Sequence, residues 1–222
     1  MHHLILFAAM FFSAASFAQL TKEVGSFNEL KVYDGLSVTL ISSTENKVEI
    51  SGESTDEVVV VNTNGILKIR MKINKIFNGH TTFVKVYFNN SIDLLDANEQ
   101  SLITSKETFS QVSLDLRVQE GGEINIKTNV QKLMSKAVSG GRIEVSGIAK
   151  NQDVQVNTGG FFEGDLLKTE QTTVQVSAGG NAYINASEYV NAKVRAGGTI
   201  RIYGKPKAID QQTVLGGTIV EQ

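Results

Sequence analysis

Cysteine is absent from the 222 residues, and histidine occurs only three times. The lack of cysteine excludes a disulfide framework, a thiolate nucleophile and a cysteine-based metal site. His2 and His3 lie in a leader segment, so His80 alone remains and a histidine-based zinc site is not expected. Tryptophan is also absent and proline occurs once, against 20 glycines. A chain poor in proline and rich in valine, isoleucine, threonine and glycine is typical of a β-rich protein.

Neither sign of charge dominates the chain. The chain has 21 lysines and arginines and 23 aspartates and glutamates, which gives a formal net charge of −2. Without a basic field, neither nucleic acid nor an anionic membrane surface is expected as a partner. No apolar run of spanning length follows the leader, so we expect a protein that is not integral to the membrane.

The leader is apolar and uncharged. Residues 4–18 are apolar or small, and the first charged side chain is Lys22. Such a run is too short to span a bilayer comfortably, and Ser16-Phe17-Ala18 resembles a small-x-small cleavage site. The leader predicts a signal peptide over residues 1–18, with Gln19 as the new N-terminus. The protein is then exported to the periplasm, the cell surface or the medium. The alternative is a buried N-terminal helix.

An internal repeat occupies the second half of the chain. Gly-Gly pairs begin at positions 121, 140, 159, 179, 197 and 216, so the steps are 19, 19, 20, 18 and 19 residues. A valine precedes each pair, and apolar residues follow at alternate positions. Strand, Gly-Gly corner, strand and loop therefore recur, which predicts an all-β protein built as a parallel β-helix, or solenoid, over residues 98–222.

The glycines are expected at sharp corners of the coils. Glycine adopts positive φ at little cost and lets neighbouring coils approach closely, so side chains should be poorly tolerated there. The predicted corner glycines are Gly122, Gly141, Gly160, Gly180, Gly198 and Gly217. The preceding valines are expected to stack as one internal ladder, which comprises Val118, Val138, Val156, Val176, Val194 and Val214.

Residues 19–97 lack Gly-Gly and show clearer alternation at short range. The expected strands are 27–33, 36–42, 47–51, 58–63, 66–71 and 83–88, and residues 73–80 are expected to form a loop. Asn64-Gly65 between two of these strands indicates a tight hairpin. We expect an N-terminal antiparallel β region that caps one end of the solenoid.

The repeated units V-x-V-x-x-G-G-x-I-x-I carry a resemblance to a known family. Phe27-x-x-Leu30-x-Val32 near the start and Ile202-Tyr203-Gly204-Lys205-Pro206 near the end extend it over about residues 25–220. The chain resembles the putative auto-transporter adhesin, head GIN domain family. That resemblance implies an exported protein with a pectin-lyase-like β-helix that lacks the catalytic residues, and a role in adhesion. It implies no particular functional residue.

Catalytic motifs are weak or incomplete. Two carboxylate pairs, Glu163 with Asp165 and Asp93 with Asp96, have the side chains needed for acid–base work. No cleft that would hold a substrate between them is evident, and His80 falls in an expected loop. Phosphate-binding and calcium-roll motifs are incomplete. We therefore predict no catalytic residue, no metal and no cofactor, so the protein is not expected to be an enzyme.

One surface stripe is a candidate for binding. By alternation, Phe161 and Tyr183 point outward on neighbouring coils, on a strand face that also carries Arg142, Glu163 and Arg201. Exposed aromatic rings beside polar groups can stack on sugars or anchor a protein partner. The alternative is that both rings pack under a loop or against the preceding face.

Three functions remain open at this point. The first is a binding or adhesion module, whose partner is a glycan or a cell-surface protein. The second is a polysaccharide-active enzyme on the same fold, and the third is a structural envelope protein. Homo-oligomers through the faces or ends of the solenoid are compatible with each of the three.

Overall fold

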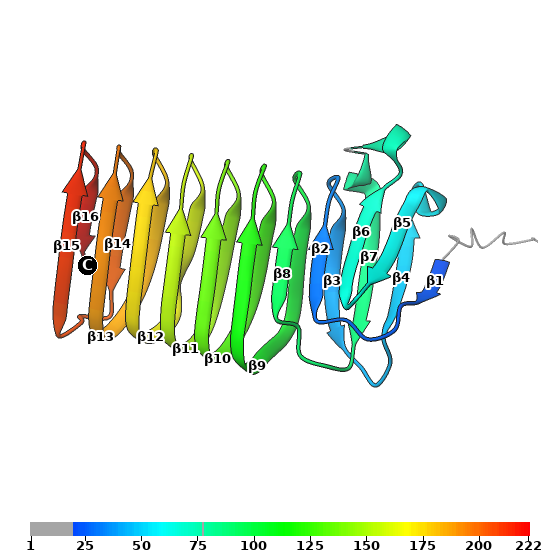
Figure 1. The fold of residues 1–222 in the computed structure, drawn as a ribbon, viewed down its shortest axis with the longest axis horizontal. Coiled ribbons are helices and arrows are strands. Elements are labelled where there is room, and N and C mark those ends of the chain that lie inside the picture. Colours follow the sequence, from blue (N-terminus) through cyan, green and yellow to red (C-terminus); the bar gives the residue numbers. More distant parts are fainter. Residues whose placement is uncertain (1–19, 77) are drawn as a thin grey trace, which may run out of the picture.

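The computed structural model describes residues 20–76 and 78–222, so the predicted signal peptide lies outside the described residues. The chain forms a β-solenoid of about 7 turns, and the coils stand side by side along one axis (Figure 1). A row of tight turns follows one edge of the stack, as Figure 1 shows. The all-β solenoid predicted from the Gly-Gly repeat is confirmed.

Long strands form the regular coils, and each pairs in parallel with the next. They are β9 (Leu102–Val118), β10 (Glu123–Ala137), β11 (Arg142–Val156), β12 (Phe161–Ser177) and β13 (Asn181–Arg195). The last coils contain β14 (Thr199–Tyr203), β15 (Ala208–Val214) and β16 (Thr218–Glu221). The first part of β13 pairs with β14 and its second part with β15, so each long strand bends and contributes to two faces.

Parallel pairing extends toward the N-terminus beyond residue 98. Strand β2 (Glu29–Val32) pairs with β8 (Leu94–Ala97), and β3 (Ser37–Ser42) pairs with β9. Strands β2 and β3 also meet at a turn in which Asp34 and Gly35 have positive φ. Residues 29–42 therefore stack on the solenoid as a further coil.

Antiparallel strands cover this N-terminal end. They are β1 (Leu20–Glu23), β4 (Lys47–Gly52), β5 (Val58–Thr63), β6 (Ile66–Met71) and β7 (Thr82–Phe88). Strands β6 and β7 also pair in parallel with β2 and β3, so the parallel stacking continues through them. The hairpin expected at Asn64-Gly65 joins β5 and β6, and both turn residues have positive φ. Three short 3₁₀ turns, η1 (Thr55–Glu57), η2 (Ile73–Lys75) and η3 (Gly79–Thr81), complete this region. The segment 73–80, expected to be a loop, contains η2 and the first two residues of η3.

The buried side chains that precede each corner stack as one continuous internal ladder. Two of the six valines predicted to belong to this ladder do not. Val118, Val156, Val176 and Val194 are at most 1% exposed and stack in register. Ala137, not Val138, occupies this position on β10, and Thr213, not Val214, occupies it on β15. The assignment of Val138 and Val214 is wrong because only one residue separates them from Gly-Gly, which moves them to the next side-chain position.

The first four Gly-Gly corners are four-residue turns whose two central residues have positive φ. At the last two corners the second glycine, Gly198 or Gly217, has positive φ as well. At Asn157–Gly160, Thr158 has φ 50° and Gly159 has φ 69°, and the Gly160 N–H donates to the Asn157 carbonyl at 3.0 Å. Positive φ at both central positions defines a type I′ turn. The positive φ thus falls on the first glycine of the pair and not on Gly160.

The second glycine is required for a different reason, which is close approach of the preceding coil. A Cβ on Gly160 would lie 2.4 Å from the carbonyl oxygen of Ala137. Equally short contacts, under 3.0 Å, would arise at Gly122, Gly141, Gly180, Gly198 and Gly217. Coils can therefore stack at the interstrand distance only if this position lacks a side chain.

Within the described residues, no helix is long and apolar enough to cross a bilayer.

The register of the internal ladder generates a stability prediction. Val176→Ala should lower the free energy of unfolding by about 1–3 kcal/mol, because it leaves a cavity between two coils. Val214→Ala, at a position 39% exposed, should cost under about 0.5 kcal/mol. Urea melts of the two variants measure both effects. Equal losses would contradict the register.

The two glycines of one corner should differ in how much a substitution by alanine destabilises the protein. Gly159→Ala should cost about 1 kcal/mol, because its φ of 69° is unfavourable for alanine but no atom lies within 4 Å of the new Cβ. Gly160→Ala should cost more, because its Cβ would collide with the backbone of the preceding coil. Thermal unfolding of both variants checks this order, and a smaller loss for Gly160→Ala would refute the close-approach argument.

Candidate functional site

The candidate stripe lies on the face formed by the first halves of the long strands. Arg142 pairs in register with Phe161, and Glu163 with Tyr183, which in turn pairs with Arg201. These five outward side chains, here called the aromatic stripe, thus come from four successive coils. Phe161 and Tyr183 are each half-buried, and Arg201 is exposed. Because strand pairing brings them together, the stripe is a contiguous surface.

The rings and guanidinium groups of the stripe form a chain of contacts along the axis of the solenoid. The rings of Phe161 and Tyr183 meet edge to face, with centroids 5.1 Å apart and planes at 77°. The Arg142 guanidinium lies 4.8 Å from the centroid of Phe161, and that of Arg201 lies 5.1 Å from the centroid of Tyr183. Both separations are within the range of cation–π attraction. The two rings and two guanidiniums therefore hold one another in place.

The two arginines of the stripe differ in their charge partners. Arg142 forms an ion pair and hydrogen bond with Glu163, and their side chains are 41% and 27% exposed. Among residues 20–76 and 78–222, no carboxylate forms an ion pair with Arg201. The charge of Arg142 is thus neutralised within the stripe, whereas that of Arg201 faces solvent.

Alternation also places residues on this face that the sequence analysis did not single out. Tyr203 is the next outward position after Arg201 on β14 and is half-buried. Asn181 and Thr199 continue the row that contains Arg142 and Phe161. The same period-two pattern that located Tyr183 would have located Tyr203.

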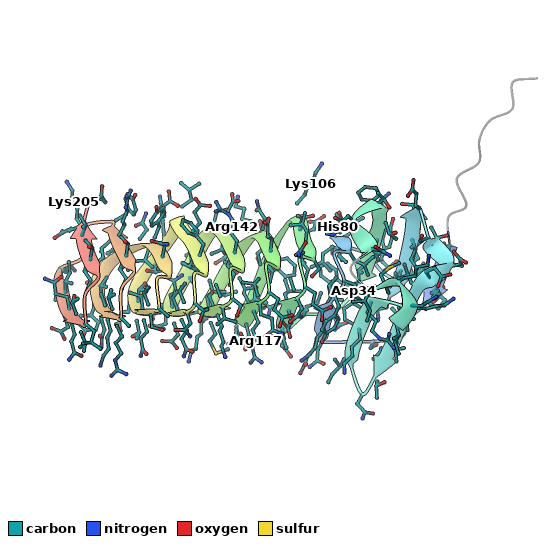
Figure 2. The ribbon with its side chains drawn as sticks, turned by 90° about the horizontal axis from the view of Figure 1, so that it is seen from above. Asp34, His80, Lys106, Arg117, Arg142 and Lys205 are labelled. Carbon is teal, nitrogen blue, oxygen red and sulfur yellow. The ribbon has the colours of Figure 1, made fainter. Side chains whose placement is uncertain are left out.

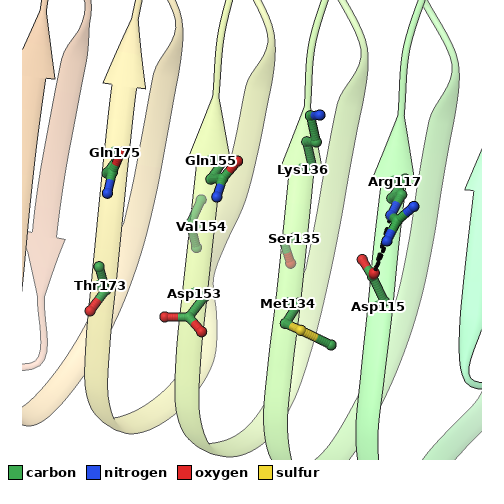
Figure 3. A pocket seen from close by; sticks show the side chains of 10 residues that line it. All are labelled: Asp115, Arg117, Met134, Ser135, Lys136, Asp153, Val154, Gln155, Thr173 and Gln175. Carbon is green, nitrogen blue, oxygen red and sulfur yellow. Dashed lines mark hydrogen bonds and ion pairs between the residues drawn. The ribbon is translucent and has the colours of Figure 1, made fainter.

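The opposite face carries an open polar trough over strands β9 to β12 (Figure 3). Figure 2 shows Arg142 and Arg117 on opposite sides of the flattened solenoid. Arg117 binds Asp115 at 2.6 Å, and Asp153 pairs with Lys132 at 3.2 Å. These pairs neutralise most of the charge along the trough. The remaining lining residues are Met134, Ser135, Lys136, Val154, Gln155, Thr173 and Gln175.

Three of the four carboxylates considered for catalysis are engaged in structural contacts, namely Glu163, Asp93 and Asp96. Glu163 pairs with Arg142, and Asp93 accepts a hydrogen bond from the Asn28 amide at 3.0 Å. Burial raises the pKa of Asp96, although Lys31 lies 3.8 Å away and Asn98 donates to it at 3.1 Å. Asp96 therefore belongs to a hydrogen-bonded network on the face opposite the stripe.

His80 packs against the first corner of the solenoid. Its ring occupies the space beside Gly35, where a Cβ would lie 2.6 Å from the ring. The Gly79 N–H, next to it in η3, donates to the carbonyl of Asp34 at 3.0 Å. His80 thus helps to attach the N-terminal region to the corner. Among the described residues, no three His, Cys, Asp or Glu side chains are grouped so as to hold a metal ion.

Acidic side chains gather at the first corners, away from the stripe. Asp34 is 4% exposed, and its carboxylate accepts the backbone N–H of Met71 at 2.9 Å. The pKa of the neighbouring Glu99 carboxyl is raised by burial first, then by its contact with Asp34 and by the charge of Glu120. Burial and like charges both disfavour ionised Glu99. Ionisation of Glu99 is therefore less favourable in the folded protein than in the unfolded chain.

A family model described as "Putative auto-transporter adhesin, head GIN domain" matches residues 26–206. No curated protein matches the chain significantly.

Solved structures resemble the chain over nearly its whole length. One is a putative adhesin from Bacteroides fragilis, with 18% identity, a TM-score of 0.83, and coverage of 94% of this chain and 98% of that one. A putative adhesin from Parabacteroides merdae has 16% identity and a TM-score of 0.73, with 94% and 97% covered. A putative lipid binding protein from Parabacteroides distasonis has 16% identity and a TM-score of 0.68, with 93% and 98% covered. At these identities the likeness shows a shared fold.

The pKa of Glu99 generates a pH-dependent prediction. Because its pKa is raised in the folded state, stability is retained at low pH and lost as pH rises through the unfolded and then the folded pKa. Glu99→Gln should therefore stabilise the protein at pH 7, and the gain should vanish below about pH 4. Melting temperatures across this range test it, with the exposed Glu170→Gln as control. A gain that persists at low pH would contradict the electrostatic cause.

Proposed function

Because this chain belongs to the family described as putative auto-transporter adhesin, head GIN domain, we propose that it is an exported, non-catalytic adhesion module that binds a carbohydrate. The observation that carries this proposal is the aromatic stripe. Its two partly exposed rings lie on a flat strand face and are held by guanidinium groups. A surface arranged before binding loses little conformational freedom when a ligand is bound.

The surroundings of the rings favour a sugar over a protein as the ligand. Phe161 and Tyr183 supply apolar contact, while Asn181 and Thr199 beside them supply hydrogen-bonding groups. Aromatic rings flanked by amides and hydroxyls suit the apolar faces and hydroxyl groups of a pyranose. Protein interfaces require a larger apolar centre. In the two rows that contain Phe161 and Tyr183, every other position on β10 to β14 carries a polar or charged side chain.

The solenoid supports this role by its rigidity. Continuous parallel pairing from β9 to β13 fixes the spacing of outward rows at about 4.8 Å per coil. A ligand that extends along the axis would therefore meet successive coils at a constant interval. This geometry suits display of a binding surface and does not require a cleft.

A glycan-array screen of the full chain tests the proposal. We expect at least one carbohydrate to bind, and Phe161→Ala and Tyr183→Ala each to weaken that binding about tenfold or more. Gln155→Ala, an exposed change on the opposite face, is the matched control. Melting temperatures measured alongside distinguish loss of a ring from loss of the fold.

Two results would contradict this function. Binding that survives both ring substitutions would place the ligand elsewhere on the molecule. Absence of binding to every carbohydrate would favour a purely structural role.

A further inference from the structure

We propose that the carbohydrate is acidic, and that Arg201 binds an oxyanion group on one of its sugar units. This inference rests on the proposed function and specifies the ligand of the same surface. The starting observation is the asymmetry of the two arginines of the aromatic stripe. Both lie over aromatic rings, but only Arg142 is paired with a carboxylate.

The contacts of Arg201 orient its guanidinium without neutralising it. The ring of Tyr183, 5.1 Å away, holds the group by cation–π attraction. The N–H groups of a guanidinium donate hydrogen bonds in the plane of the group, whereas the Tyr183 ring lies over its face. The five N–H donors of Arg201 therefore remain available to a ligand. A carboxylate or sulfate that approaches in the plane of the group can accept two of them at once.

Arg201 has no acidic side chain next to it in its row, that is, among the residues in register with it on neighbouring strands. Its register partners are Tyr183 on the preceding coil and Val220 on the following one. On its own strand, the adjacent outward residues are Thr199 and Tyr203. Glu163, in the same row, is two coils away, which is about 10 Å at the interstrand spacing. At physiological salt, charges at that distance are largely screened, so the positive charge of Arg201 is left for a ligand.

The residues around Arg201 supply the aromatic and hydroxyl groups that can contact the uncharged parts of an acidic sugar. Tyr183 and Phe161 extend the contact toward the N-terminal coils, and Thr199 lies next to Arg201 in the adjacent row. An acidic unit at Arg201 would therefore place the next unit of an extended chain over the aromatic rings. Arg142, paired with Glu163, would then contact a neutral part of the ligand.

The decisive comparison uses one sugar backbone with and without charge. The probes are a β-1,4-linked glucuronate tetramer, its methyl ester and a sulfated tetramer of the same backbone, each titrated against the full chain by calorimetry. We expect the glucuronate, the sulfated tetramer or both to bind at least about tenfold more tightly than the ester. The advantage should shrink as salt concentration rises.

Substitutions of the arginine test the assignment to one residue. Arg201→Gln should remove the preference for the acidic probe, so that the variant binds the glucuronate and its ester with similar affinity. Arg201→Lys should retain part of the preference, because lysine keeps the charge but loses the two-pronged geometry. Arg117→Gln, on the opposite face, is the charge-matched control. Melting temperatures check that each variant is folded.

The outcomes separate this inference from the proposed function. Equal affinity for the acidic and esterified probes, or an unchanged preference in Arg201→Gln, would overturn the acidic assignment while carbohydrate binding stands. Selective binding of an acidic peptide such as poly-glutamate, with no sugar bound, would overturn both.

Discussion

Close approach between successive coils at the Gly-Gly corner is the constraint on which the rest of the structure depends. The second glycine of each pair lies where a Cβ would meet the preceding coil, as at Gly160 against Ala137. The N–H of the first glycine donates to the next corner, for example from Gly159 to the carbonyl of Ala178 at 3.2 Å. Hydrogen bonding between coils therefore continues through the turns, and the strands on both sides keep one register.

That register sorts the side chains into an interior and two outer faces. Phe162 is fully buried among smaller inward residues, and Gly164 on the same strand leaves room for it, because a Cβ there would lie 2.4 Å from the ring. The balance of large and small groups keeps the coil thickness uniform. The outer faces are then flat enough for rows of side chains from different coils to contact one another.

The aromatic stripe is a consequence of this stacking. Arg142, Phe161, Tyr183 and Arg201 are separated by 18 to 22 residues along the chain, yet each contacts the next through its ring or guanidinium. The opposite face shows a different pattern, in which Arg117 and Lys132 are each paired with an aspartate. Cations without an ion pair, such as Lys136 and Lys193, also lie on the opposite face. Among the described residues, however, Arg201 is the one cation without an ion pair that lies over an aromatic ring, and this contact supports the carbohydrate and charge assignments.

The sequence by itself determined the all-β solenoid, its 19-residue period and the outward direction of Phe161 and Tyr183, because strand alternation and glycine spacing are local properties. It misassigned Val138 and Val214, since one residue fewer before Gly-Gly reverses which side chain faces inward. It also left open which residues of separate coils meet, because that depends on register. Only the tertiary structure decided that Arg142 is paired with Glu163 while Arg201 lies over Tyr183 without a carboxylate partner among the described residues. These contacts join strands far apart in sequence, and no local pattern specifies the distance between their side chains.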